Sequence, residues 1–192
     1  MSVIGKAAPS WKGQAAKAGE IVTLSSDELR GKWVVLFFYP LDFTFVCPTE
    51  IVAYDAAYER FTAAGAEVIG VSIDSVHTHL AYMRTPRSEA GVGELKFALL
   101  SDMGRELTNG FDVADATGLK ALRATFIIDP NGVVQSAMIN NLSIGRNVDE
   151  TFRLLRAAQY AFTNGDVCPA NWEDGDEGMK ATLTGVKGVI NH

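Results

Sequence analysis

The chain holds two cysteines, Cys47 and Cys168, and each lies in a context that suggests redox chemistry. Cys47 follows a hydrophobic run and a proline, in the segment Pro40-Leu41-Asp42-Phe43-Thr44-Phe45-Val46-Cys47-Pro48. Cys168 comes near the end, after the last strong helical pattern. A thiolate that is oxidised to a sulfenic acid can condense with a second thiol to form a disulfide. The two contexts therefore predict one cysteine that its substrate oxidises and a second that rescues it.

The surroundings of Cys47 favour a reactive thiolate. Pro48 is typical of the first position of a helix, so Cys47 is expected at or just inside a helix start, where free amide hydrogens and a partial positive charge favour an anion. Arg123, at the start of a later strand, would add a full positive charge, and the Thr44 hydroxyl could share the pocket. From these residues alone, Cys47 is equally well interpreted as a small buried hydrophobe. A cap or turn for Thr44 and an exposed charge for Arg123 are the commoner roles.

The elements that would position these residues alternate between strands and helices. An irregular hairpin is expected over residues 11–20, and a second hairpin over residues 124–139. Buried strands are expected at 34–39, 67–73 and 97–100. Helices are expected at 48–64, 75–85, 105–110 and 147–164. This order predicts an α/β fold with a central mixed sheet flanked by helices. Cys47 lies where a strand's carboxyl end meets the next helix, the usual place for chemistry in such folds.

The chain divides by pattern into a domain over residues 1–164 and an extended C-terminal tail over residues 165–192. From Gly165 onward no strong period remains, and several glycines and acidic residues occur. We therefore expect this tail, which carries Cys168, to be held by few contacts.

Composition limits the partners. The chain has 192 residues, 47% of them hydrophobic, and a net charge of −6, which is typical of a soluble globule and argues against a nucleic-acid or anionic-membrane partner. The longest strongly apolar run, residues 33–39, is too short to span a bilayer. The first residues do not resemble a signal peptide, so a cytoplasmic location is expected. In that reducing compartment a cysteine pair is more often redox-active than a permanent crosslink.

Histidine could signal a metal site or a general base, and His77 and His79 are the candidates. The chain has three histidines in all and no compact Cys/His spacing, so no metal is expected. We interpret both side chains as solvated or interface positions on a helix.

The motif Pro40-x-x-x-Thr44-x-x-Cys47 resembles the signature of the peroxiredoxins. The segment from Phe43 to Glu50 is similar to the typical 2-Cys group, which includes the peroxidase component of bacterial alkyl hydroperoxide reductase and the thioredoxin peroxidases. The likeness continues nearly end to end, through Asp74-Ser75, Thr78-His79-Leu80, Arg123-Ala124-Thr125-Phe126-Ile127-Ile128-Asp129, Ile144-Gly145-Arg146 and Val167-Cys168-Pro169-Ala170. It implies a thioredoxin-like fold and an antioxidant enzyme that reduces hydrogen peroxide and alkyl hydroperoxides without a cofactor.

The resemblance also implies a role for each site residue. Cys47 would be the peroxidatic cysteine, whose thiolate attacks one peroxide oxygen, while Thr44 and Arg123 align the peroxide and stabilise the charge on the leaving oxygen. Pro40 would shield the pocket from water. Glu50 and Arg146 would brace Arg123. From sequence alone these two residues are explained equally well as a surface ion pair.

The implied partner of Cys47 is Cys168, the resolving cysteine of a second subunit. The functional unit would be a homodimer, with a contact near Phe45 and Thr78 that joins five dimers into a decamer. Either thioredoxin or a flavoprotein disulfide reductase would serve as electron donor.

Other functions stay open at this stage. The same scaffold could act as an oligomeric chaperone (a holdase) or in peroxide signalling. A cysteine hydrolase would need a histidine base beside Cys47 and has no use for Cys168. A thioredoxin-like disulfide reductase would need a Cys-x-x-Cys motif, which the chain lacks.

Overall fold

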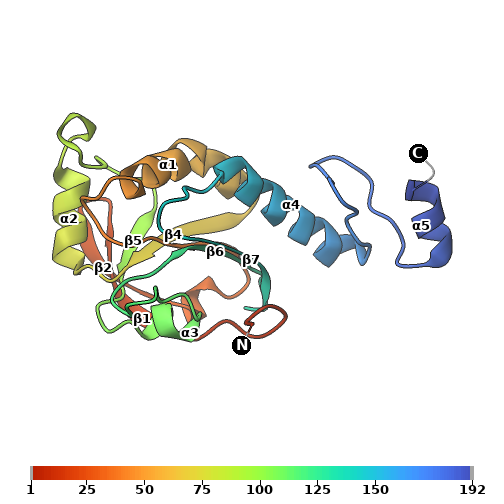
Figure 1. Ribbon diagram of the computed structural model, residues 1–192, viewed down its shortest axis with the longest axis horizontal. Coiled ribbons are helices and arrows are strands. Elements are labelled where there is room, and N and C mark those ends of the chain that lie inside the picture. Colours follow the sequence, from red (N-terminus) through yellow and green to blue (C-terminus); the bar gives the residue numbers. More distant parts are fainter. Residues whose placement is uncertain (1, 191–192) are drawn as a thin grey trace. The chain divides into compact units, whose positions relative to one another are not determined.

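The computed structural model describes residues 2–190, and within them the strands form one seven-stranded sheet (Figure 1). The order across the sheet is β2-β1-β5-β4-β3-β6-β7. The strands are β1 (Lys12–Lys17), β2 (Glu20–Ser25), β3 (Trp33–Phe38), β4 (Ala66–Ser72), β5 (Ala98–Ser101), β6 (Arg123–Ile128) and β7 (Val134–Asn140). The helices are η1 (Asp27–Leu29), α1 (Cys47–Ala63), α2 (Val76–Arg84), η2 (Arg87–Glu89), α3 (Glu106–Gly110), α4 (Val148–Asn164) and α5 (Leu183–Ile190).

The sheet is mixed, as predicted. Strands β3, β4 and β5 run parallel at its centre, because α1 and α2 provide the crossovers that parallel neighbours require. Strand β6 pairs antiparallel with β3, and β1 pairs antiparallel with β5. The carboxyl ends of β3, β4 and β5 therefore meet at one edge of the sheet, and α1 begins just beyond that edge. The fold class inferred from the sequence is confirmed.

The two faces of β3 belong to two parts of the core. Successive side chains of a strand point to opposite faces. The Phe38 ring packs 5.4 Å from Phe111, just beyond α3, whereas the Phe37 ring stacks 4.2 Å from Tyr54 of α1. All four of these rings are buried. Strand β3 is thus fixed from both sides, which gives the loop after it a rigid starting point.

The first hairpin is more regular than the sequence indicated. Strands β1 and β2 pair residue by residue around a two-residue turn, Ala18-Gly19. Both turn residues have positive φ, 49° for Ala18 and 79° for Gly19, which matches the twist of a tight hairpin. Gly19 adopts its positive φ without strain and so allows the regular pairing on either side of the turn.

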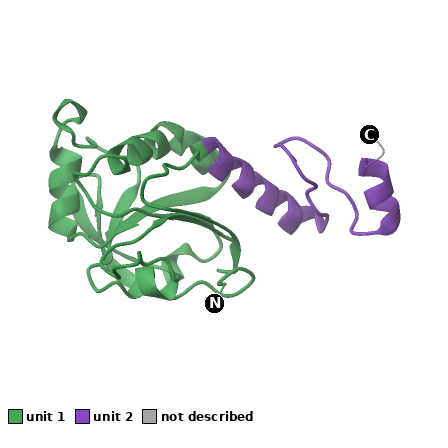
Figure 2. Ribbon diagram, in the orientation of Figure 1, with its two compact units in different colours: residues 1–148 green, residues 149–192 purple. Residues whose placement is uncertain are grey.

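The chain forms two compact units, residues 1–148 and 149–192 (Figure 2). The second unit contains most of α4 and all of α5. Helix α5 was not predicted, because it is short and Gly185 and Gly188 interrupt its pattern. The boundary at residue 164 proposed from the sequence pattern stays a prediction.

Residues 165–180 are tied to α4 within the second unit, so the expectation of few contacts is wrong for this stretch. Trp172 is 2% exposed, and its ring lies 5.4 Å from that of Tyr160. The Gly178 amide donates to the Tyr160 hydroxyl oxygen at 2.9 Å, and Val167 pairs with Met179 through two backbone hydrogen bonds. Tyr160 and Trp172 thus hold a segment whose hydrophobic residues show neither helical nor strand periodicity.

None of the helices among residues 2–190 is long and apolar enough to cross a membrane.

Candidate active site

Cys47 is the first residue of α1 and is fully buried. Pro48 occupies the next position, as the sequence predicted for a helix start. The Val46 carbonyl accepts from the amides of Thr49 and Glu50 and so closes the first turn. The sulfur therefore sits at the positive end of a 17-residue helix, which favours negative charge on it.

The Thr44 hydroxyl contacts the sulfur directly. Its Oγ1 lies 2.9 Å from Cys47 Sγ and 2.9 Å from the Leu41 carbonyl oxygen. A hydroxyl has one hydrogen, so it donates to one of these groups at a time. Beside a thiol it can accept from S–H while it donates to the Leu41 oxygen. Beside a thiolate it can turn its hydrogen toward the sulfur.

Arg123 reaches the same sulfur from β6. The antiparallel register pairs Phe38 with Ala124, so Arg123 lies just past the carboxyl end of β3. Its Nη1 lies 3.4 Å from Cys47 Sγ, and its Nε donates to the Leu142 carbonyl at 2.7 Å. The residue is 4% exposed, so its charge acts where water screens little.

Glu50, one turn into α1, joins two arginines behind the sulfur. Its carboxylate accepts four hydrogen bonds, one from Arg123 Nη1 at 2.8 Å and three from the backbone amide, Nε and Nη2 of Arg146 at 2.8–2.9 Å. All three residues are buried, so the alternative of a surface ion pair is excluded. One carboxylate between two guanidiniums leaves a net positive charge beside Cys47.

Arg146 is itself fixed by the core. Its Nη1 donates to the carbonyls of Phe38 and Ala124 at 2.7 and 2.8 Å, and its guanidinium lies 5.3 Å from the centre of the Phe37 ring. The position of Arg123 is therefore set through Glu50 by two neighbouring strands of the sheet, β3 and β6.

Pro40 is buried two residues after the end of β3, at the start of the loop that leads to Cys47. It lies on the same loop as Thr44. Its shielding of the pocket stays a prediction.

Cys168 is a free, half-buried thiol in the second unit. Its sulfur lies 3.5 Å from the carbonyl oxygen of Ala157 in α4. Burial raises the pKa of the Cys168 thiol, and the positive charge of Arg153 partly opposes this effect. Arg153 is held by Glu150 and by the Trp172 carbonyl. The folded tail therefore disfavours the thiolate form of Cys168.

The structure also brings together three residues that the sequence analysis did not assign to the site. His79 is fully buried, and its Nδ1 lies 2.7 Å from Asp42 Oδ2, so the expectation of a solvated or interface position is wrong for this residue. The Tyr39 hydroxyl donates to Asp42 Oδ1 at 2.7 Å. Burial, reinforced by the charge of Asp42, raises the pKa of Tyr39 well above its usual value, which keeps the phenol a hydrogen-bond donor.

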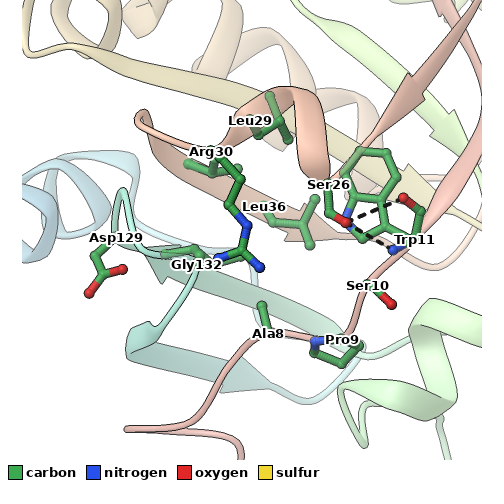
Figure 3. Close-up of a pocket in the computed structure, with 12 residues that line it drawn as sticks. Ala8, Pro9, Ser10, Trp11, Ser26, Leu29, Arg30, Leu36, Asp129 and Gly132 are labelled. Carbon is green, nitrogen blue, oxygen red and sulfur yellow. Dashed lines mark hydrogen bonds between the residues drawn. The ribbon is translucent and has the colours of Figure 1, made fainter.

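A small cavity of about 40 Å³ lies at the opposite end of β3 (Figure 3). Trp11, Leu36 and Ile128 contribute to its lining, and Arg30 reaches over it to donate to the Asn131 carbonyl. Cys47 does not line this cavity.

Comparisons with known proteins agree with this geometry. The model of the AhpC/TSA family matches residues 4–137, and that of the C-terminal domain of 1-Cys peroxiredoxin matches residues 157–192. The chain is 51% identical over 166 residues to the human mitochondrial thioredoxin-dependent peroxide reductase, covering 86% of this chain and 64% of the human protein. It is 47% identical over 180 residues to rat peroxiredoxin-2, covering 94% of this chain and 91% of the rat protein.

Solved structures give the same result. The crystal structure of reduced Plasmodium vivax 2-Cys peroxiredoxin matches with a TM-score of 0.96 and 42% identity over the whole of both chains. That of Enterococcus faecalis AhpC matches with a TM-score of 0.83 and 36% identity, covering 88% of this chain and all of the other.

Proposed function

This chain belongs to the AhpC/TSA family and is a peroxiredoxin, a thiol-dependent peroxidase, and from that premise we propose that Cys47 is its peroxidatic cysteine. One observation carries the assignment. The Cys47 sulfur is buried at a helix start with a hydroxyl at 2.9 Å and a guanidinium nitrogen at 3.4 Å. A sulfur in an inert core position would be surrounded by apolar groups.

In the first step the Cys47 thiolate attacks the terminal oxygen of a hydroperoxide. The S–O bond forms as the O–O bond breaks, which leaves a sulfenic acid on Cys47 and an alkoxide, or hydroxide when the substrate is hydrogen peroxide. The leaving oxygen takes a proton from water. Arg123 stabilises the charge that develops on this oxygen, and the Thr44 hydroxyl orients the peroxide in line with the sulfur. Pro40, on the same loop, limits the access of water.

In the second step the thiol of Cys168 from a partner subunit condenses with the sulfenic acid. The S–S bond forms and water leaves. The pKa of Cys168 is raised by burial, so release of the tail from α4 would favour the thiolate that performs this attack. We propose a homodimer as the unit of this chemistry and five dimers as the full assembly.

The disulfide is then reduced by a dithiol donor, and we propose thioredoxin. The human relative is named a thioredoxin-dependent peroxide reductase, which supports this donor over a flavoprotein reductase. We propose a cytoplasmic location, because such a cycle needs a steady supply of reduced donor. Cell fractionation tests the location. The holdase and signalling alternatives are not favoured by the comparisons.

Two single variants test the mechanism. With thioredoxin, thioredoxin reductase and NADPH, the Cys47→Ser variant should consume no peroxide. The Cys168→Ser variant should consume one equivalent quickly and then turn over poorly. Non-reducing electrophoresis should show a disulfide-linked dimer for the oxidised wild type and for neither variant. Full turnover by Cys47→Ser would refute the assignment of the peroxidatic cysteine, and full turnover by Cys168→Ser would refute that of the resolving cysteine.

A further inference from the structure

The loop between β3 and α1 carries the reacting groups, and a buried hydrogen-bonded cluster holds it at Asp42. The side chains of Asp42 and His79 are both 0% exposed, and their contact at 2.7 Å joins the loop to α2. The second carboxylate oxygen of Asp42 accepts from Tyr39 at 2.7 Å. Both oxygens of the buried Asp42 carboxylate therefore have a hydrogen-bond partner. Removing either His79 or Tyr39 would leave one of these oxygens without one.

The backbone at the same position is also anchored. The Asp42 amide donates to Asp74 Oδ2 at 2.9 Å, and this oxygen accepts from Ser72 at 2.6 Å as well. Asp74 follows the carboxyl end of β4, so the loop is tied to a second central strand. Asp42 is thus anchored through both its backbone amide and its buried side chain.

The next residue shows that the loop is held in a demanding shape. Phe43 has a φ of 53°, in the left-handed region that a bulky side chain rarely adopts. Its ring packs 4.5 Å from Tyr82, on the same helix as His79. A conformation of this kind persists where surrounding contacts over-determine it. The Asp42 cluster and the contact with Tyr82 are those contacts.

We propose that Asp42 and His79 are positioning residues for the peroxide reaction. Their buried pair holds the loop against α2 and so places the Thr44 hydroxyl beside the Cys47 sulfur. Asp42 lies two residues before Thr44 and five before Cys47, so a shift of the anchor is transmitted to both over a short, constrained path. A displacement of about 1 Å in a reacting geometry can cost roughly 100-fold in rate. This inference rests on the proposed function of Cys47.

The anchoring of the loop depends on a hydrogen-bond donor at Nδ1 of His79. Asp42 accepts from that nitrogen, and an asparagine at position 79 can present an amide N–H at nearly the same place. The His79→Asn variant therefore keeps the contact, whereas His79→Leu fills the space and leaves one oxygen of Asp42 unpaired. Tyr39→Phe removes only the second donor and leaves the ring in place.

Asp129→Asn is the matched control. Asp129 is likewise a buried carboxylate and accepts three hydrogen bonds, against two for Asp42, but it lies just after β6 at the opposite end of the sheet. Its substitution should lower stability without moving the loop at Asp42.

The experiment uses the full chain with Cys168→Ser, so that only the reaction of Cys47 is observed. Two rates are measured by stopped flow at a temperature where circular dichroism shows each variant folded. One is the reaction with hydrogen peroxide, which requires alignment of the oxidant. The other is alkylation by iodoacetamide, which requires a reactive thiolate but not the same alignment.

His79→Leu should slow the peroxide reaction by at least about tenfold, in line with a partial misplacement of the reacting groups, and change alkylation by less than about threefold. His79→Asn should restore most of the peroxide rate, and Asp129→Asn should keep the parent rate. Equal loss of both rates in His79→Leu, equal slowing by Asn and Leu, or a parent peroxide rate in His79→Leu would each overturn the proposal. If His79→Leu does not fold, Tyr39→Phe decides, and an unchanged peroxide rate in that variant overturns it. If the Cys168→Ser parent itself does not react with peroxide, the proposed function fails instead.

Discussion

Replacing Glu50 by glutamine should change the position of the Arg123 side chain while keeping its positive charge in the site. Glu50 accepts four hydrogen bonds from two buried arginines. A glutamine amide offers one oxygen as acceptor and an NH₂ group that would face arginine N–H groups, so about two of these bonds are lost. Arg123 keeps its bond to Leu142 but loses the carboxylate that directs Nη1 toward the sulfur.

The size of the effect follows from the burial of this cluster. Removing one partner of a buried ion pair costs about 3–5 kcal/mol of stability. A charge-assisted hydrogen bond contributes about 1.5–3 kcal/mol. If the bond that holds Arg123 acts fully in the transition state, its loss slows the reaction about 10- to 150-fold. The Glu50→Gln variant should therefore remain folded at moderate temperature but react slowly.

The assay is stopped-flow reaction of the reduced protein with hydrogen peroxide, together with urea unfolding. Glu59→Gln is the control, because it is the same substitution on the same helix at a side chain that is 81% exposed. It should change neither quantity measurably. A folded Glu50→Gln protein that reacts at the wild-type rate would show that the bond to Leu142 alone positions Arg123, and the reasoning about Glu50 would be refuted.

Three further predictions rest on single contacts. Thr44→Val removes the hydroxyl 2.9 Å from the Cys47 sulfur and should slow the peroxide reaction by about tenfold or more, whereas Thr44→Ser should keep most of the rate. Equal rates of the two variants in stopped flow would contradict the role of the hydroxyl. Arg153→Gln removes the cation that opposes the raised pKa of Cys168, so the pKa should rise further and the midpoint of the pH profile for disulfide formation should move upward; a downward shift would contradict the sign of this interaction. In Gly178→Ala the new Cβ would lie 2.5 Å from a ring carbon of Tyr160, so the tail should loosen and limited proteolysis at residues 165–180 should accelerate; unchanged cleavage would mean that the ring moves aside.

Much of the fold could be predicted because its elements are long and strongly patterned. The apolar run that forms β3 and the proline at the start of α1 determine where Cys47 lies. The family resemblance also indicated which residues would surround it, whereas the residue types alone favoured a cap or turn for Thr44 and an exposed charge for Arg123. It could not show that Glu50 and Arg146 are buried, because this depends on the pairing of β6 with β3 and on a segment far along the chain.

The sequence contains a spacing that predicts burial of His79, although the small number of histidines led to the expectation of a solvated or interface position. Val76, His79, Leu80 and Met83 have the i, i+3, i+4, i+7 spacing of a buried helix face, and all four are buried. A histidine on such a face needs a buried partner, and Asp42 supplies it from a loop 37 residues earlier. The spacing predicts burial, whereas the identity of the partner requires the tertiary structure.

The tail was harder to predict for a different reason. Its contacts with α4 involve single side chains, such as Tyr160 and Trp172, and backbone groups without a periodic pattern. Such contacts stabilise a segment without leaving a repeat in its sequence.

The distance along the chain between Glu50 and Arg146 has a consequence for biosynthesis. The two residues are 96 positions apart, and Arg146 also binds the backbone of β3 and β6. A nascent polypeptide still lacking position 146 contains Cys47 but neither the second guanidinium nor the complete brace of the first. With Cys47 as the proposed peroxidatic cysteine, we therefore expect this thiol to become sensitive to oxidants late in translation, when nearly the whole of the first compact unit has left the ribosome.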